Sequence, residues 1–176
     1  VPAITGGIGV CHVYVDESAD IDKAVEIIYN SKVQRPSVCN ALDTVIFNQN
    51  INKDIILNTV KKLVGSKVEI RADDQSYEIL SSLNKDYPNS IYVATDEDWG
   101  QEFLSLKLSV RMTDSLENAI EYINNYGGHS EAIISENQDN TARFLKAIDS
   151  SAVFVNTSTR FNDGGELGLG AEVAIS

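Results

Sequence analysis

The sequence predicts an α/β domain of three layers, in which helices cover both faces of a mainly parallel sheet. Short apolar or β-branched runs alternate along the chain with segments of helical periodicity, and this rhythm is typical of consecutive βαβ crossovers. The 176 residues are 43% hydrophobic and 23% charged, values that are ordinary for one globular core. Because no repeat, linker or low-complexity tract divides the sequence, we expect a single domain over residues 1–176.

The expected strands are short runs rich in aliphatic, β-branched or aromatic residues. They lie at residues 10–15, 44–47, 68–71, 106–110, 132–135 and 152–155. A polar stretch over residues 84–100 contains Pro88 and the only tryptophan, and we expect mostly loop there, with a candidate strand at residues 91–94.

The expected helices lie between these strands, and most combine an apolar stripe with a start or stop signal. They are a helix at 20–30, a helix whose apolar stripe begins at Ile56 and which ends at Gly65, a weaker helix at 75–83, one from Asp114 to a glycine pair at 127–128, and one around 142–148. The tail after the last strand has four glycines within residues 164–170. We expect there either an irregular loop that needs positive φ or a flexible end.

Charge and cysteine content limit the classes of partner. The formal net charge is −12 at pH 7, which argues against nucleic acid because phosphate binding needs clustered Lys and Arg side chains. No apolar run approaches the length that spans a bilayer, so no membrane partner is expected. Two cysteines do not form a disulfide framework, and a reducing compartment such as the cytoplasm is the simplest expectation.

Cys39 is the candidate nucleophile. Pro36 should end the preceding helix, which places Cys39 in a turn between a helix and a strand. Backbone N–H groups of such a turn, and the Arg35 cation if it folds back, would favour the thiolate. From spacing alone, a buried structural cysteine is the more common alternative.

The other cysteine and the two histidines are more ambiguous. Cys11 lies in an apolar run, where a free core cysteine is far more common than a second nucleophile. His12 alternates with apolar neighbours and could be a half-buried polar residue, whereas His129 follows a glycine pair at a helix end, where a cation suits the dipole. Either histidine is also a candidate base for Cys39. No set of Cys, His and carboxylate residues has metal-ligand spacing, so no metal is expected.

The glycine-rich run at residues 5–9 precedes a strand instead of opening a helix. The dinucleotide fingerprint requires a strand, a glycine turn and then a helix. We therefore expect no nucleotide-binding motif within this chain.

Five segments occur in a family-like order and spacing. They are residues 9–16 (GVCHVYVD), 34–42 (QRPSVCNAL), 129–134 (HSEAII), 155–161 (VNTSTRF) and 163–172 (DGGELGLGAE). Together they resemble the gamma-glutamyl phosphate reductase family of the aldehyde dehydrogenase superfamily, over nearly the whole chain. The resemblance implies that Cys39 is the nucleophile, and that its backbone N–H, next to Asn40, is the local donor to the developing oxyanion.

The resemblance also implies a reaction and a larger enzyme. The reaction is NADPH-dependent reduction of L-glutamyl 5-phosphate to L-glutamate 5-semialdehyde and phosphate, through a Cys39 thioester, in proline biosynthesis. The fold would be of the aldehyde dehydrogenase catalytic-domain type. NADPH would be bound mainly by a dinucleotide-binding domain that is absent from this chain. The full-length enzyme would be a homo-oligomer, and the segment that pairs its subunits would be absent from this chain as well. This fragment alone would then be inactive.

The resemblance extends to two further positions, one that concerns cofactor binding and one that concerns the activation of water for hydrolysis. Glu102-Phe103 resembles the superfamily's Glu-x-Phe segment, whose glutamate holds the nicotinamide ribose, although Leu104 and Ser105 replace the usual glycine and proline. The alternative for Glu102 is a surface acid. Hydrolytic aldehyde dehydrogenases carry a water-activating glutamate in a glycine-rich turn near the start of this domain. Residues 4–7 contain no acid, which fits a reductase.

Three cationic or titratable side chains are candidates for substrate binding. Arg160 follows the last strand, and its guanidinium suits bidentate binding of a carboxylate or phosphate. His129 and Arg35 are the other candidates. For Arg160 the alternative is a surface salt bridge.

Three interpretations therefore compete. The first is the reductase, the second is a cysteine-dependent aldehyde dehydrogenase for another acyl substrate, and the third is a catalytically silent α/β domain kept for assembly. A phosphate-dependent back reaction would separate the first two. The reactivity of Cys39 relative to Cys11 would identify the third.

Overall fold

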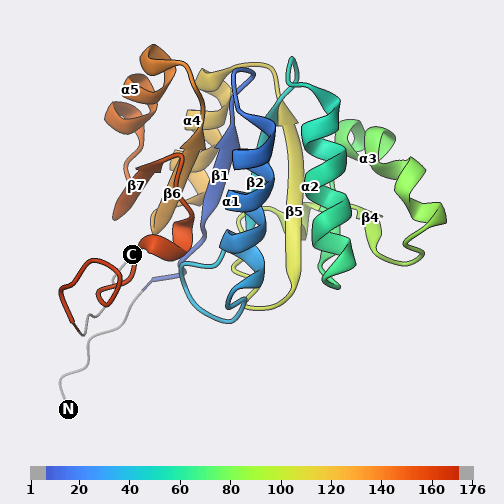
Figure 1. The fold of residues 1–176 in the computed structure, drawn as a ribbon, viewed down its shortest axis with the longest axis horizontal. Coiled ribbons are helices and arrows are strands. Elements are labelled where there is room, and N and C mark those ends of the chain that lie inside the picture. The colour runs from blue at the N-terminus through green and yellow to red at the C-terminus, as the bar shows by residue number, and fades with distance from the viewer. Residues whose placement is uncertain (1–6, 171–176) are drawn as a thin grey trace.

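Seven strands form one sheet in which every neighbouring pair is parallel (Figure 1). The structure is a computed structural model that describes residues 7–170, so Thr5 and Gly6 of the glycine-rich run lie outside the described residues. The expected parallel sheet is confirmed, and its strand order is β4-β3-β5-β2-β1-β6-β7. The strands are β1 His12–Val15, β2 Thr44–Asn48, β3 Glu69–Ala72, β4 Ile91–Val93, β5 Lys107–Thr113, β6 Ser130–Ile134 and β7 Ala152–Val155.

Each α-helix of the described part begins at a residue whose side chain accepts a hydrogen bond from a first-turn N–H group. Such caps stabilise the start of a helix because these N–H groups have no partner within it. None of the described helices is long and apolar enough to cross a membrane. The helices, with their caps, are α1 Ile21–Val33 (Asp20), α2 Lys53–Gly65 (Asn52), α3 Asp74–Leu80 (Asp73), α4 Leu116–Tyr126 (Ser115) and α5 Gln138–Ala147 (Asn137).

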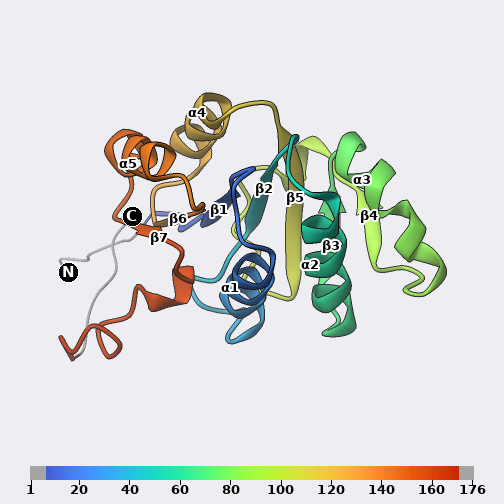
Figure 2. The same cartoon turned by 45° about the horizontal axis from the view of Figure 1, so that its top comes forward.

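The helices form one layer on each side of the sheet. Helices α1, α2 and α3 share one apolar core with the sheet, whereas α4 and α5 share the other (Figure 2). Side chains of a strand point alternately to opposite faces. In β1, Val13 and Val15 accordingly belong to the first core and Tyr14 to the second.

The boundaries differ from expectation where tertiary contacts decide them. β1 begins later than residue 10 because the main-chain N–H of Cys11 donates to the side chain of Asp43. In the polar stretch at 84–100 the candidate strand at 91–94 is confirmed as β4, and a short 3₁₀-helix, Asp96–Asp98, was not expected. Of the two alternatives for the tail, the described part up to residue 170 is an irregular loop, with Gly168 and Gly170 at positive φ.

Segments that lead into four adjacent strands meet at one edge of the sheet. Because all strands are parallel, the chain enters β5, β2, β1 and β6 from the same side. The segments that precede these strands contain Glu102, Cys39, Gly9 and His129 respectively. The strand order thus brings together candidate residues that are far apart in the sequence.

Candidate active site at the amino ends of four strands

The turn between α1 and β2 presents Cys39 to solvent. Helix α1 ends before Pro36, and residues 34–43 then lead into β2 through a series of turns. Cys39 is exposed, whereas Asn40 and Ala41 are buried. The predicted position of Cys39 in a helix-to-strand turn is therefore confirmed, and the thiol is accessible to a substrate.

The second cysteine lies directly behind this turn. Cys11 is fully buried, and its thiol donates a hydrogen bond to the main-chain oxygen of Cys39 over 3.1 Å. Burial, reinforced by the carboxylates of Glu131 and Asp43, raises the pKa of the Cys11 thiol well above its ordinary value. Cys11 thus remains protonated at neutral pH, and its interpretation as a free core cysteine is confirmed.

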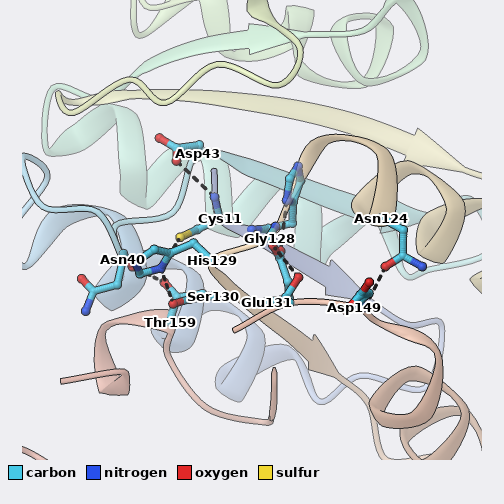
Figure 3. Close-up of polar contacts among 12 residues, drawn as sticks. Cys11, Asn40, Asp43, Asn124, Gly128, His129, Ser130, Glu131, Asp149 and Thr159 are labelled. Atoms are coloured by element: carbon cyan, nitrogen blue, oxygen red, sulfur yellow. Dashed lines mark hydrogen bonds and ion pairs between the residues drawn. The ribbon is translucent and has the colours of Figure 1, made fainter. Parts of the chain in front are cut away.

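His129 lies beside Cys11 just before β6. Its Nδ1 atom is 2.8 Å from Oγ of Ser130 and 3.8 Å from Sγ of Cys11. Figure 3 shows Cys11, His129 and Ser130 grouped between Asp43 on one side and Asn40 on the other. The imidazole is almost fully buried, so it forms part of the site wall behind the exposed turn.

Three candidate residues lie around Gly9. A Cβ atom on Gly9 would lie 3.1 Å from Cδ2 of His129, 3.4 Å from the main-chain oxygen of Cys39 and 3.4 Å from Oε1 of Glu102. Glu102 is only partly buried. A side chain at position 9 would make a tight contact with the His129 ring and would fill the space between Cys39 and Glu102, a feature that the sequence alone did not reveal.

His12 is placed differently from what its pattern suggested. It is fully buried in β1, and its Nδ1 atom lies 3.0 Å from Oε2 of Glu131, which is also fully buried. The main-chain N–H of His12 donates to the same oxygen over 2.8 Å. The expectation of a half-buried side chain was wrong because Glu131, in register on the neighbouring strand, supplies a buried partner.

Arg160 contacts the residue next to the candidate nucleophile. Its guanidinium donates to the side-chain oxygen of Asn40, and Oγ1 of Thr159 donates to the main-chain oxygen of Asn40 over 2.7 Å. Within residues 7–170, Arg160 thus pairs with a neutral amide and forms no salt bridge with an acid. Among the described residues, the buried Nε of Arg160 has no hydrogen-bond partner, so the guanidinium retains capacity for an anion.

A polar cavity opens beside this guanidinium. Its volume is about 240 Å³. It is bordered by α1 and by the segment after β7, and its lining residues are Asn30, Gln34, Thr157, Ser158, Arg160, Phe161, Asp163 and Glu166. Arg160 thus borders this cavity and contacts Asn40, the residue that follows Cys39.

A buried ion pair behind the turn escaped the sequence analysis. Nζ of Lys32 lies 3.9 Å from Oδ1 of Asp43, and both side chains are almost completely buried. Burial lowers the pKa of Lys32 to about 8 and raises that of Asp43 to about 6, because desolvation outweighs their mutual attraction. The available signal was spacing: Lys32 lies one turn after Ile28 on the buried stripe of α1.

Arg35, the remaining candidate, is exposed in the turn that carries Cys39. Within residues 7–170, no group of three or more Cys, His, Asp or Glu side chains could hold a metal ion. The side chains gathered around the Cys39 turn are polar or cationic, among them Asn40, His129 and Arg160.

Comparison with known proteins confirms the resemblance. The chain is 49% identical over 176 residues to gamma-glutamyl phosphate reductase of Roseiflexus castenholzii, covering all of this chain and 41% of that protein. It is also 49% identical over 177 residues to the protein of that name from Syntrophomonas wolfei, of which it covers 40%. The chain thus spans about two fifths of the length of these relatives. No family model matches it.

Solved structures agree with the fold. The crystal structure of gamma-glutamyl phosphate reductase from Thermotoga maritima matches with a TM-score of 0.90 and 41% identity, over all of this chain and 41% of that one. An acetylating aldehyde dehydrogenase from Geobacillus thermoglucosidasius matches with a TM-score of 0.67 and 20% identity, over 98% of this chain and 44% of that one. The second match concerns the fold alone. The chain therefore has the α/β fold of the part of these proteins that it matches.

Proposed function

We propose that this chain is the cysteine-bearing catalytic part of an NADPH-dependent gamma-glutamyl phosphate reductase that acts in proline biosynthesis. The observation that carries the proposal is the exposed Cys39 thiol, in a turn that meets Glu102 and His129 around Gly9. Similarity to proteins of that name supports the choice of substrate. The dinucleotide-binding and oligomerisation segments would belong to the rest of such an enzyme.

The first half of the reaction forms a thioester on Cys39. The thiolate attacks the γ-carbonyl carbon of L-glutamyl 5-phosphate, and the carbonyl electrons move to oxygen. The main-chain N–H of Cys39 is the local donor that stabilises this oxyanion. When the carbonyl re-forms, the bond between carbon and the phosphate oxygen breaks, and phosphate leaves with the electron pair.

The second half reduces the thioester. NADPH, when bound, supplies the hydride that converts the thioester carbon to a thiohemiacetal. Collapse of the thiohemiacetal releases L-glutamate 5-semialdehyde and returns the Cys39 thiolate. The partly exposed carboxylate of Glu102 fits the ribose next to the nicotinamide, because a carboxylate accepts hydrogen bonds from hydroxyl groups and Gly9 leaves space beside Cys39.

Arg160 is the residue best suited to the anionic substrate. The chain carries a formal charge of −12, so an anion needs a local cation to offset the overall field. Arg160 borders the polar cavity and holds Asn40, the neighbour of Cys39. It would bind the α-carboxylate or the phosphate with donors that the Asn40 contact leaves available.

The proposal is tested by phosphate dependence in the full-length enzyme. Semialdehyde and NADP⁺ without phosphate should produce about one turnover and then stall, since no acid within residues 4–7 is available to activate water. General-base assistance is typically worth about 10²–10⁴-fold, so the unassisted thioester should persist. Adding phosphate should restore steady turnover, and Cys39→Ser should abolish it without loss of folding.

The same assay addresses the competing enzyme. Continuous release of free glutamate without phosphate, at a rate close to the phosphate-driven one, would show that another base activates water. A hydrolytic aldehyde dehydrogenase would then replace the reductase as the proposed function. Normal turnover by Cys39→Ser would exclude both.

A further inference from the structure

The buried Lys32–Asp43 pair takes no part in the chemistry proposed above, yet it lies directly behind the turn that carries Cys39. Removing two charges from water is costly, and replacing such a pair by apolar side chains is often neutral or stabilising. Stability alone is therefore a weak explanation for the pair. Its contacts indicate another role.

The carboxylate of Asp43 connects three segments of the candidate site. Oδ2 accepts a hydrogen bond from the main-chain N–H of Cys11 over 3.2 Å, and Oδ1 accepts one from the main-chain N–H of Phe103 over 3.0 Å. Asp43 itself ends the turn that presents Cys39. One side chain thus joins the start of β1, the Cys39 turn and the loop before β5.

Lys32 holds the carboxylate oxygen of Asp43 that accepts the hydrogen bond from Phe103. Its Nζ atom lies 3.9 Å from Oδ1 of Asp43 and donates to the main-chain oxygen of Leu42 over 2.7 Å. The same ammonium lies 5.9 Å from the centre of the Phe103 ring. Lys32 therefore contacts both ends of the link between the Cys39 turn and the loop.

The loop that receives this link carries Glu102. Leu104, two residues later, is exposed and has a φ of +49°, a conformation that is unfavourable for a residue with a side chain. Such a loop keeps its shape only if its surroundings hold it. The hydrogen bond from Phe103 to Asp43 does so immediately next to Glu102, whose Oε1 atom points toward Gly9.

We infer that Asp43, held by Lys32, is a positioning residue that sets the place of Glu102 relative to Cys39. The inference rests on the proposed function, because it assigns Glu102 to the nicotinamide ribose. A change at Asp43 should then weaken cofactor binding more than it slows the chemical step. A merely structural pair would instead lower stability without a selective effect on the cofactor.

The test uses Asp43→Asn in the full-length enzyme, assayed with semialdehyde, NADP⁺ and phosphate. Asparagine keeps the size of the side chain but has no charge and only one acceptor oxygen. The hydrogen bond from Phe103 is therefore either lost or, as a bond to a neutral amide oxygen, weaker than the one to the carboxylate. We expect the KM for NADP⁺ to rise about tenfold or more, the effect of one hydrogen bond to a charged group, with a smaller change in kcat. Asp16→Asn is the matched control, because Asp16 is equally buried at the opposite edge of the sheet.

A second measurement does not depend on activity. Hydrogen exchange at the Phe103 amide should be faster in Asp43→Asn than in the wild type, and unchanged in Asp16→Asn. Asp43→Asn leaves the charge of Lys32 uncompensated and could prevent folding. In that case the double variant Lys32→Met/Asp43→Asn, which removes both charges, takes its place in both the kinetic assay and the exchange measurement.

The outcomes separate the inference from the proposed function. Unchanged exchange at Phe103 together with an unchanged KM for NADP⁺ would overturn the positioning role. A wild-type enzyme with no phosphate-dependent turnover would instead overturn the proposed function, and the exchange arm would still decide whether Asp43 holds the loop.

Discussion

The Cys11 thiol donates a hydrogen bond to the main-chain oxygen of Cys39, with a sulfur–oxygen distance of 3.1 Å. The two cysteines thus occupy opposite sides of one turn, with Cys11 fully buried and Cys39 exposed. The buried thiol uses its proton to hold the main chain of the turn. The Cys39 thiol lies on the exposed side, so the two cysteines differ in their access to reagents in solution.

This arrangement predicts a large difference in thiol reactivity. Alkylation requires the thiolate, and burial raises the pKa of Cys11 well above its ordinary value. We expect iodoacetamide at pH 7 to label Cys39 at least about tenfold faster than Cys11, as followed by mass spectrometry of the two peptides. The denatured protein should label both at similar rates. Equal rates in the folded protein would favour the catalytically silent interpretation.

Gly9→Ala should impair catalysis more than stability. The new methyl group would lie 3.1 Å from Cδ2 of His129, so the His129 ring, next to the Cys39 turn, must move slightly. Because a misplacement of about 1 Å can cost about 100-fold in rate, we expect kcat/KM to fall about tenfold or more. Gly65→Ala is the control, since a Cβ atom there meets nothing within 4 Å at the end of α2. It should leave the kinetics unchanged, and equal activity losses in both variants would contradict the crowding argument.

Most of the fold was predictable because its signals are local. Helix α4 is marked by its cap, Ser115, and by the glycines after it, and β2 is marked by a β-branched run. The limits of β1 were less predictable. They depend on Asp43, which bonds to Cys11 across 32 residues of sequence.

The candidate site was predictable only in part, because strand order is not a local property. The pattern around Pro36 placed Cys39 in a turn, but nothing local indicated that Gly9, Glu102 and His129 would surround it. The general rule for ligand sites in parallel sheets would also have predicted the wrong edge of the sheet. Ligands of open parallel sheets usually bind at the carboxyl ends of strands, whereas this site lies at the amino ends.

The buried pair predicts a specific pH dependence of stability. The pKa of Asp43 is raised to about 6 in the folded protein, so between about pH 4 and 6 the folded state binds a proton that the unfolded chain has released. The stability contributed by this group is therefore fully present below about pH 4 and is lost as the pH rises through about 6. A shift of about two pKa units corresponds to about 3 kcal/mol.

Asp43→Asn removes this titration. The free energy of unfolding of the wild type, minus that of the variant, should fall by about 3 kcal/mol from pH 4 to pH 6, as measured by urea unfolding at each pH. Lys32→Met should show the opposite trend at high pH. The pKa of Lys32 is lowered to about 8, so its contribution is lost as the pH falls toward 8. A difference that does not vary with pH would show that neither group titrates as described.

Arg160→Lys should weaken substrate binding selectively in the full-length enzyme. The guanidinium holds the side chain of Asn40 and still has a buried Nε donor without a partner in the described part of the chain. A lysine ammonium is a single point charge and cannot reproduce this planar set of donors. We expect the KM for semialdehyde or phosphate to rise about tenfold, the effect of losing one charge-assisted hydrogen bond, while the KM for NADP⁺ stays within about twofold.

Arg143→Lys is the matched control, because Arg143 is an exposed residue that pairs with Glu117 on the outer surface of α4 and α5. This variant should change none of these constants. A rise in the KM for NADP⁺ alone would move Arg160 from the substrate to the cofactor, and no change in any constant would reduce it to a structural link to Asn40.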